Sequence, residues 1–513
     1  MHKCVKVMLA SVRVKLFRAP KKDRSGQNKL FSDVVAHRRT GSYKLWAFEQ
    51  AMFEKRFYVE GLAHASYLIG DAGQAAVIDP KRDVDDYLET AAQKKLKIVA
   101  VLETHPHADF VSGHVELAAR TGASVYVSAL APARYKRSPV RDGDVIRLGS
   151  LEIIALETPG HSPDSVSFVV RVAGKPVSVF TGDTLFAGDV GRPDLRDAEE
   201  KPTRLAAALY DSLFQKLLEL PAETKVFPAH GAGSLCGRKI SSAPFTTIGQ
   251  ERLFNWALQI KDREEFVRRM VENLPDRPPY FSHDVQVNLA GAPSLDSLPP
   301  LRALTEPELK AQSAGGTIVI DTRSAPFFGA GHFPGSLNIG LSSNLFSTWA
   351  GFLVPFGKPL ALVVGSADSA PRARLELARI GYDNVIGFLE ADQLIQRKQL
   401  SQLGVDELQF ALKRREAPRL LDVRTVGEWE AQHIEGALHI PLPRLPRHLA
   451  ELPPDRPLAV ICGSGYRSSI AASLLQSAGF SRVQNVMGGM GAYQETQIPE
   501  WEPADLVFLA ENI

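Results

Sequence analysis

Three side chains that can bind a metal ion lie far apart in the chain, each in a short motif. His105 belongs to Thr-His-Pro-His-Ala-Asp-Phe (104–110), His161 to Thr-Pro-Gly-His (158–161) and Asp183 to Thr-Gly-Asp (181–183). Two imidazoles and one carboxylate can hold an iron(II) ion and leave coordination positions open for substrate and O₂. The residue types therefore predict a metal site made of His105, His161 and Asp183.

The elements that must position these ligands are short apolar runs typical of β-strands. Predicted strands over 98–103, 151–156 and 177–180 end just before the three motifs, so each ligand lies in a loop on a rigid sheet. Runs over 66–69 and 75–78, separated by turn residues at 71–73, predict a hairpin. Segment 84–95 has the apolar spacing of a helix.

The first motif resembles the H-x-H-x-D-H motif of metallo-β-lactamase-fold proteins, with one departure. The last histidine of that motif binds a second metal ion, and Phe110 stands in its place here. A phenyl ring cannot bind a metal ion, so the resemblance implies one metal rather than two. His107, Asp109 and His230 match positions that bind metal in two-metal relatives, and we expect them to orient the ligands or the substrate.

A second chemical site is predicted in Cys-Gly-Ser-Gly-Tyr-Arg (462–467). The cysteine follows an apolar run and precedes a helical pattern, where backbone N–H groups and the helix dipole stabilise a thiolate. The glycines let the loop curl so that its amides converge on an anion. Cys462 is the expected nucleophile and Arg467 a fixed positive charge. The rest of the loop is expected to bind substrate: Gly463, Ser464, Gly465 and Tyr466.

The C-terminal half of the chain contains an internal repeat. Val-Ile-Asp-Thr-Arg (319–323) matches Leu-Leu-Asp-Val-Arg (420–424), and segment 358–366 matches 456–464. The strands alternate with helical patterns, which predicts two α/β domains with parallel sheets covered on both faces. The first copy has Val364 where the second has Cys462, so we expect the first copy to be catalytically inactive.

The second copy resembles rhodanese sulfurtransferases over its full length. Its Cys-x4-Arg loop is one residue shorter than the Cys-x5-Arg loop of cysteine phosphatases, a size that suits a sulfane sulfur rather than a phosphate. Fragments 188–195 and 228–234, with the His105 motif, resemble persulfide dioxygenases, the iron-dependent branch of the metallo-β-lactamase fold. The order of domains resembles bacterial persulfide dioxygenase–rhodanese fusions.

This resemblance implies an α/β multidomain chain with an αββα sandwich and two rhodanese-like domains. The expected divisions are a basic leader, the metal domain, a proline-rich linker, an inactive rhodanese-like domain and an active one, over residues 1–51, 52–275, 276–302, 303–398 and 399–513. The leader is expected to be disordered or to precede the true start, although it also resembles a transit peptide.

The resemblance also implies an activity. A mononuclear Fe(II) centre would oxidise a thiol persulfide of glutathione, coenzyme A or cysteine type with O₂ to sulfite, and the rhodanese domain would make or use thiosulfate. The resemblance favours a homo-oligomer.

Two residues and the class of reaction are left with open alternatives. Arg192 is a candidate to bind the anionic part of the substrate or, equally, to pair with Asp194. Cys236 is either a sulfur relay near the iron or an inert packed cysteine. The alternative activities are a zinc thioester hydrolase of glyoxalase II type, fused to a sulfurtransferase, and a scaffold with an inactive metal domain.

The amino-acid composition indicates the cellular compartment of the protein and the kinds of partner that it lacks. Three cysteines in 513 residues argue against a disulfide framework and for a reducing compartment, so we expect a cytoplasmic protein. Residues 1–51 carry 12 Lys and Arg against 3 Asp and Glu, and the remainder carries 48 against 55. The mildly acidic body gives no electrostatic reason to bind nucleic acid. Apolar runs are too short for a membrane span.

Overall fold

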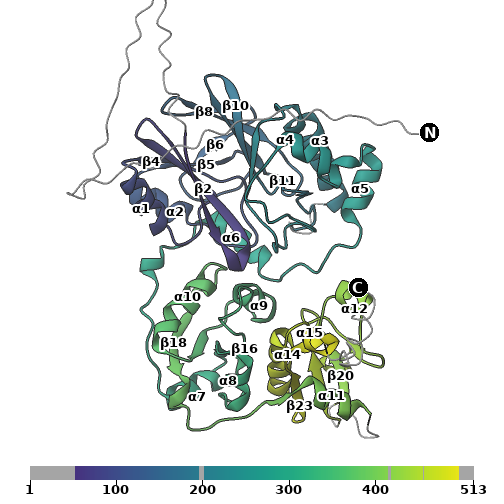
Figure 1. Cartoon of the computed structure of the whole chain (residues 1–513). Helices are drawn as coiled ribbons and strands as arrows, with labels where there is room; N and C mark the ends of the chain where they lie inside the picture. The colour runs from purple at the N-terminus through teal and green to yellow at the C-terminus, as the bar shows by residue number, and fades with distance from the viewer. Residues whose placement is uncertain (1–51, 196–200, 414–417, 454–455, 496–513) are drawn as a thin grey trace, which may run out of the picture. The chain divides into compact units, whose positions relative to one another are not determined.

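The computed structural model describes residues 52–195, 201–413, 418–453 and 456–495 (Figure 1). The expectation for the basic leader, residues 1–51, lies outside this range. The described part contains a metal-site domain followed by two smaller α/β domains.

Two six-stranded sheets face each other in the first domain. The strand order of the first sheet is β1-β2-β3-β4-β5-β6, and that of the second is β14-β13-β10-β9-β8-β7. The bounds are β1 Phe53–Val59, β2 His64–Asp71, β3 Gln74–Ile78, β4 Lys97–Leu102, β5 Ser124–Ser128, β6 Ser138–Val140, β7 Val145–Leu148, β8 Leu151–Glu157, β9 Val166–Val172, β10 Lys175–Gly182, β13 Lys225–Pro228 and β14 Thr246–Thr247, with a separate pair β11 Leu185–Phe186 and β12 Asp189–Val190.

The predicted hairpin is confirmed, since β2 pairs antiparallel with β3 from Tyr67 opposite Ile78 to Asp71 opposite Gln74. Its turn places Ala72 and Gly73 at positive φ. Alternate side chains of both sheets point between them and form one apolar core, which includes Tyr67, Phe168 and Phe180. This alternation follows from the two-residue period of a strand.

Helices cover the outer face of each sheet and complete the αββα layers (Figure 1). One apolar cluster packs α1 and α2 on the first sheet, and another packs α3 and α5 on the second. The bounds are α1 Asp85–Gln93, α2 His114–Thr121, α3 Pro202–Gln215, α4 Ile248–Phe254 and α5 Arg263–Val271.

The structure differs from the sequence prediction between residues 276 and 302. The proline-rich stretch predicted a linker, but Phe281–Ala290 forms a helix, α6, whose residues Phe281 and Asn288 are buried. Tyr280, just before α6, is also buried, and its hydroxyl donates to the carbonyl oxygen of Asp109 at 3.3 Å. This segment is therefore packed against the metal-site loop.

The two C-terminal domains each contain a fully parallel sheet, as the repeat predicts. The strand orders are β16-β15-β17-β18 and β19-β23-β22-β20-β21. The first domain has α7 Glu306–Ala314, β15 Ile318–Asp321, α8 Ala325–Ala330, β16 Leu337–Asn338, α9 Phe346–Leu353, β17 Leu360–Val364, α10 Ala370–Ala378 and β18 Val385–Glu390. The second has β19 Ser401–Leu403, α11 Val405–Leu412, β20 Arg419–Asp422, α12 Val426–Ala431, β21 Leu438–His439, α13 Leu445–His448, β22 Leu458–Ile461, α14 Tyr466–Ser477, β23 Val483–Val486 and α15 Gly489–Glu495.

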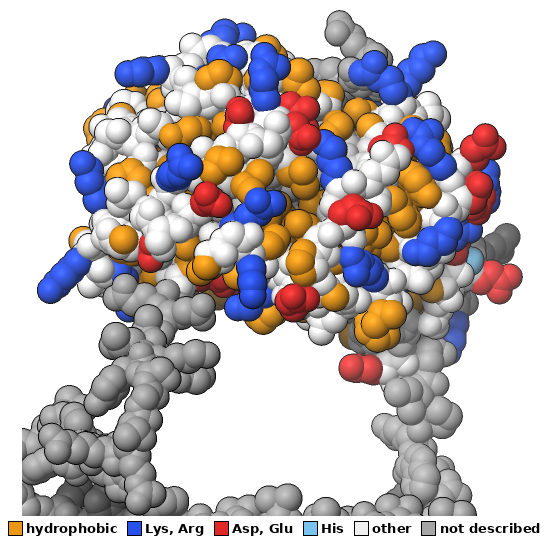
Figure 2. All heavy atoms as spheres, turned by 90° about the horizontal axis from the view of Figure 1, so that it is seen from above, with side chains coloured by type: hydrophobic (Ala, Val, Ile, Leu, Met, Phe, Trp, Pro, Cys, Tyr) orange, Lys and Arg blue, Asp and Glu red, His pale blue; other side chains and the backbone are white. Residues whose placement is uncertain are grey.

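The surface shown in Figure 2 mixes both signs of charge with apolar side chains, and neither sign gathers on this face among the described residues. None of the helices in the described ranges combines the length and the apolar character that a membrane crossing requires.

Candidate metal centre and sulfur-transfer site

The structure brings the three predicted metal ligands together at the carboxyl ends of strands from both sheets. His105 follows β4, His161 lies between β8 and β9, and Asp183 follows β10. His161 Nε2 lies 3.5 Å and His105 Nε2 4.0 Å from Asp183 Oδ2. All three side chains are buried, and their ligand atoms lie within 4.8 Å of one another.

Hydrogen bonds fix the orientation of His105. Thr104 Oγ1 donates to Asp79 Oδ2 at 2.9 Å, so it is free to accept from His105 Nδ1 at 3.0 Å. This places the proton on Nδ1, because the hydroxyl hydrogen is already used. Nε2, which has no hydrogen-bond partner among the described residues, is then left as a lone pair for a metal ion.

The protonation states of the predicted ligands suit the binding of a cation. Burial, followed by the neighbouring His107, holds the pKa of His105 well below its ordinary value, so this imidazole is neutral. Burial alone would raise the pKa of Asp183, but His230 and His161 hold it well below its ordinary value. Neutral imidazoles and an ionised carboxylate are the forms that coordinate metals, so the residues fit a divalent ion.

Asp109 and His230 lie next to the three ligands and interact with them. His230 Nδ1 is 2.8 Å from Asp183 Oδ1, and its Nε2 is 2.7 Å from Asp109 Oδ2. Cys236 belongs to the same group, since its sulfur and the ligand atoms of Asp109 and His230 lie within 4.8 Å of one another. The structure thus brings together residues for which the sequence predicts an orienting role and a relay.

His107 belongs to a third buried group, with Asp79 and Glu103. His107 Nε2 is 3.1 Å from Asp79 Oδ1, and the pKa of His107 is raised, because the charge and the hydrogen bond of Asp79 outweigh the opposing effect of burial. Burial raises the pKa of Glu103 to about 8. Ser112 Oγ donates to Glu103 Oε1 at 2.8 Å.

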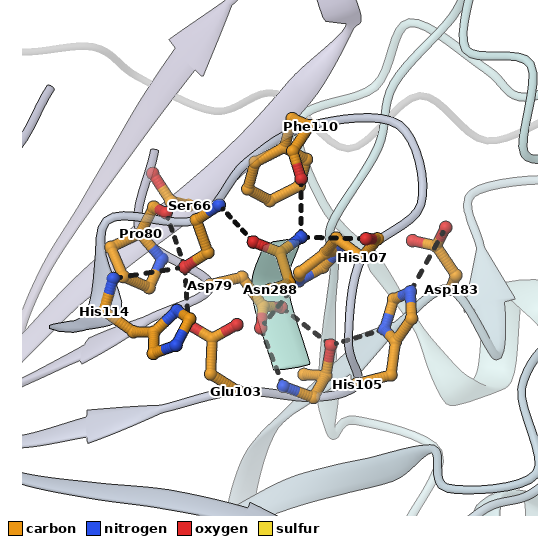
Figure 3. Close-up of polar contacts among 12 residues, drawn as sticks. Ser66, Asp79, Pro80, Glu103, His105, His107, Phe110, His114, Asp183 and Asn288 are labelled. Atoms are coloured by element: carbon orange, nitrogen blue, oxygen red, sulfur yellow. Dashed lines mark hydrogen bonds and ion pairs between the residues drawn. The ribbon is translucent and has the colours of Figure 1, made fainter. Parts of the chain in front are cut away.

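Helix α6 supplies a residue that sequence reasoning missed. Asn288 Nδ2 donates to the carbonyl oxygens of His107 at 2.8 Å and Phe110 at 2.7 Å, and Ser112 N donates to Asn288 Oδ1 at 2.8 Å (Figure 3). One buried amide therefore holds three points of the loop that follows His105. No local pattern signals this role, because 176 residues separate Asn288 from Ser112.

His64, the first residue of β2, is a second buried neighbour that the sequence did not indicate. Its ring stacks on Phe110 with 3.8 Å between centroids, and lies 5.8 Å from the ring of His230. Phe110 is 1% exposed, so its ring is part of the packed wall of the site.

Arg192 forms an ion pair with Asp194, one of the two roles that its sequence position allows. Its Nη2 donates to Asp194 Oδ2 at 2.7 Å and its Nη1 to the carbonyl of Leu235 at 3.2 Å, and the side chain is 1% exposed. Arg192 N also donates to the carbonyl of Cys236 at 3.0 Å. These contacts give Arg192 a role in fixing the loop that carries Cys236.

The C-terminal site has the geometry expected of a loop that stabilises a sulfur anion. Cys462 Sγ accepts from Gly465 N at 3.1 Å and from Ser468 Oγ at 3.3 Å. Gly465 has φ +94°, which favours glycine. A Cβ on Gly489 would lie 2.2 Å from the carbonyl oxygen of Cys462, so only glycine allows this close approach.

Arg467 is held by a bidentate pair with Glu428, at 2.7 and 2.6 Å. Although partial burial favours the neutral acid, hydrogen bonds from Arg467 and Thr425 lower the pKa of Glu428 to about 2. The hydroxyl of Tyr466 donates to Gly340 of the preceding domain at 3.1 Å. In that domain, buried Val364 ends β17 at the position of Cys462, as predicted.

A cavity of about 690 Å³ is lined by residues of all three domains, including Leu235, Trp349, Val426 and Arg467. A separate, much smaller pocket shares Gly233, Leu235 and Thr348 with it and is lined also by Asp109. Residues of the larger cavity therefore lie near Asp109 and include Arg467 of the sulfur-transfer loop.

Comparisons with known proteins agree with this architecture. The family model of the metallo-beta-lactamase superfamily matches residues 59–230, and that of the rhodanese-like domain matches residues 305–391 and 405–496. The crystal structure of a metallo-beta-lactamase from Staphylococcus aureus subsp. aureus COL is similar to this chain, with 30% identity and a TM-score of 0.60 over 67% of this chain and 99% of that one.

Curated relatives fall into two groups. Human persulfide dioxygenase ETHE1, mitochondrial, is 31% identical over 235 residues, 44% of this chain and 82% of that protein. Hydroxyacylglutathione hydrolase of Hahella chejuensis is 34% identical over 160 residues, 31% of this chain. The chain spans 58% of that hydrolase. The chain belongs to the metallo-β-lactamase superfamily, and two rhodanese-like domains follow its metal domain, an arrangement consistent with a persulfide dioxygenase–rhodanese fusion.

Proposed function

We propose that the protein is a non-haem iron persulfide dioxygenase coupled to rhodanese sulfur transfer, in sulfide detoxification. The observation that carries this proposal is the ligand set His105, His161 and Asp183, with Phe110 in place of the histidine that would serve a second metal ion. A bound mononuclear Fe(II) would supply O₂ activation at coordination positions that the three ligands leave open. The similarity to human persulfide dioxygenase supports the same reaction.

The overall oxidation is balanced as R–S–SH + O₂ + H₂O → R–SH + SO₃²⁻ + 2H⁺. The outer sulfur loses four electrons, which O₂ accepts. The substrate class is a low-molecular-weight thiol persulfide of glutathione, coenzyme A or cysteine type. The cavity beside the metal site has the size of a small-molecule site and is large enough for the organic part of such a thiol.

The second reaction is sulfur transfer on Cys462. In one direction, the Cys462 thiolate attacks the outer sulfur of thiosulfate, the S–S bond of thiosulfate breaks, and sulfite leaves with its electron pair. In the other direction, sulfite attacks the outer sulfur of the Cys462 persulfide, which releases the thiolate and makes thiosulfate. The hydrogen bonds from Gly465 N and Ser468 Oγ stabilise the sulfur anion in both directions. A reducing cytoplasm suits this thiol chemistry, and we place the protein there.

The second candidate is a zinc thioester hydrolase of glyoxalase II type, fused to the sulfurtransferase. It is favoured by Asp109 and His230, which the structure keeps beside the three ligands, and by the similarity to hydroxyacylglutathione hydrolases. Product analysis separates the candidates. We expect glutathione persulfide in air to give sulfite, and S-lactoylglutathione to be left intact.

A Cys462→Ser variant divides the two proposed reactions. We expect it to consume O₂ and release sulfite as the parent protein does, but to form no thiosulfate when sulfite and persulfide are both present. Hydrolysis of S-lactoylglutathione without O₂ consumption would replace the dioxygenase proposal with the hydrolase.

A further inference from the structure

Glu428 lies beside the sulfur-transfer loop and binds Arg467 there. Its carboxylate accepts from Arg467 Nη1 at 2.7 Å and from Nη2 at 2.6 Å, so it occupies the side of the guanidinium that can hold an anion by two hydrogen bonds. A Cβ on Gly463 would lie 3.2 Å from Arg467 Nη2 and 3.7 Å from Glu428 Oε1. The ion pair therefore lies against the residue that follows Cys462, and a sulfur donor meets a positive charge that is already paired.

The start of helix α12 fixes Glu428 in this position. Glu428 Oε2 also accepts from Thr425 N at 3.0 Å and from Thr425 Oγ1 at 2.8 Å, which completes a capping box. Burial alone would raise the pKa of Glu428, but hydrogen bonds from Arg467 and Thr425 lower it to about 2, so the side chain is negatively charged at neutral pH. A movement away from Arg467 would break the cap of the helix.

The inactive copy shows which ion pairs serve the fold and which one accompanies the cysteine. The pair kept in both copies, at 2.6 Å in each, is Asp321–Arg323 and Asp422–Arg424. Phe327 stands where the second copy has Glu428, and Ser369 stands where it has Arg467. The pair of Glu428 and Arg467 is thus kept with Cys462 and lost with it, which links this pair to the reaction rather than to the fold.

The two arginines that line the large cavity are both paired with carboxylates. The charged lining residues are Arg444, Arg467, Asp276 and Glu430. Arg444 donates to Asp276 at 2.7 and 3.0 Å, and Arg467 is held by Glu428. Much of the remaining lining is apolar, which suits the organic part of a thiol. The cavity therefore favours an organic molecule over a small ion with two negative charges.

The two classes of sulfur donor differ in charge. With thiosulfate the step is Cys462–S⁻ + S–SO₃²⁻ → Cys462–S–S⁻ + SO₃²⁻, in which the S–S bond of thiosulfate breaks and sulfite leaves with the electron pair. With an organic persulfide it is Cys462–S⁻ + R–S–SH → Cys462–S–SH + R–S⁻, and solvent protonates the leaving thiolate. Thiosulfate brings two negative charges to the reacting sulfurs and a persulfide at most one, so a fixed carboxylate repels thiosulfate more strongly.

We propose that Glu428 is a specificity-determining residue that selects an organic persulfide over thiosulfate as the sulfur donor to Cys462. This inference rests on the sulfur-transfer reaction proposed above and names the class of its donor. The carboxylate reduces the positive charge that Arg467 offers to a donor, and the apolar cavity binds the organic part of a persulfide. Both chemical sites of the chain then draw on the same class of substrate.

Loading of Cys462 under argon tests the proposal, because the metal domain then has no O₂ to use. Full-length protein is mixed with thiosulfate or with glutathione persulfide, and after alkylation the added sulfur on the Cys462 peptide is followed by mass spectrometry. We expect the parent protein to load faster from glutathione persulfide. Glu428→Gln can still accept from Thr425, and we expect it to shift the ratio of the two loading rates about tenfold toward thiosulfate.

Two further variants separate the charge of Glu428 from its structural role. Glu428→Asp keeps the negative charge and should keep the ratio of the parent protein. Glu308→Gln is the matched control, because Glu308 completes a capping box with Thr305 and pairs with Arg302 at 2.9 Å in the other rhodanese-like domain. It should leave both loading rates unchanged.

Three results would overturn the proposal. They are faster loading of the parent protein from thiosulfate, an unchanged ratio in Glu428→Gln, and an equal shift in Glu428→Asp and Glu428→Gln. A purely structural role of Glu428 gives the second result, because a disturbed helix slows both donors alike. Loading by neither donor would instead overturn the sulfur-transfer reaction itself, and this inference with it.

Discussion

At the residue scale, Phe110 stands in place of the last histidine of the metal-binding motif of metallo-β-lactamase-fold proteins. Its buried ring stacks on His64 and forms part of the site wall, where relatives with two metals have a histidine. The motif alone revealed this change. It did not reveal that Cys236 lies beside Asp109 and His230, because that contact depends on the path of a distant loop.

We expect the buried carboxyl group of Glu103 to make the free energy of unfolding depend on pH. Its pKa is about 8 in the folded chain because the carboxyl is buried, against 4.5 when it is free. Between these values the unfolded chain has lost the proton that the folded chain keeps, so stability falls as pH rises. The expected slope is about 1.4 kcal/mol per pH unit. Glu103→Gln removes it and can still accept from Ser112.

Urea unfolding of metal-free protein at pH 5.5, 6.5 and 7.5 measures this slope. The variant should gain stability relative to the parent protein at each step. A difference that does not change with pH would show that Glu103 is already ionised in the folded chain.

We expect the hydrogen-bond geometry of Arg467, and not only its charge, to matter for sulfur transfer. Its guanidinium donates two hydrogen bonds to Glu428, which a lysine cannot reproduce. We expect Arg467→Lys to lower the rate of sulfur transfer from thiosulfate roughly 10- to 100-fold through the loss of a charge-assisted hydrogen bond. O₂ uptake should be unchanged. Sulfur transfer at the parent rate would show that charge alone suffices.

At the scale of elements, the sequence predicted the strands well because their apolar runs are long and bounded by turns. The hairpin of β2 and β3 and the strands before each ligand lie where expected. Helix α6 was missed because prolines surround it, and composition alone gave a linker. Its role depends on buried long-range contacts such as those of Asn288, which local pattern cannot show.

Asn288→Asp tests whether α6 belongs to the metal site. The new carboxylate would face the carbonyl oxygens of His107 and Phe110, to which the amide now donates, and would push the loop away. We expect the affinity for iron(II) to fall roughly 10- to 100-fold.

Asp284→Asn is the matched control, because it makes the reverse change on the same helix, at a carboxylate that has no hydrogen-bond partner in the described part of the chain. It should bind iron as the parent protein does. Equal affinity in the Asn288→Asp and parent proteins would remove α6 from the metal site.

At the scale of the whole molecule, ion pairs and hydrogen bonds join the domains. Arg82 pairs with Asp383 at 2.8 Å and Arg379 with Asp83 at 2.8 Å, which joins the metal domain to the first rhodanese-like domain. Asn338 of that domain accepts from Ser469 Oγ at 2.6 Å and its N donates to Ser473 Oγ at 2.9 Å, on the helix that follows Cys462. The first rhodanese-like domain therefore contacts both the metal domain and the second rhodanese-like domain.

The cavity between the domains leads to a prediction about the binding of the substrate. Val426, which is 44% exposed, lines it, whereas Ile395 is exposed elsewhere. We expect Val426→Trp to raise KM for glutathione persulfide in O₂ uptake about tenfold, with kcat little changed, because it removes room for the organic part of the substrate. Ile395→Trp should change neither. An unaltered KM in Val426→Trp would mean that the thiol does not occupy the cavity.

The most direct measurement is O₂ uptake by protein with iron at the site of His105, His161 and Asp183, supplied with glutathione persulfide in an oxygen electrode. We expect one O₂ consumed for each sulfite formed, or for each thiosulfate where a second persulfide supplies its outer sulfur, and no uptake by His161→Ala. No O₂ consumption, with iron confirmed in the protein, would contradict the dioxygenase proposal and leave the thioester hydrolase as the better account.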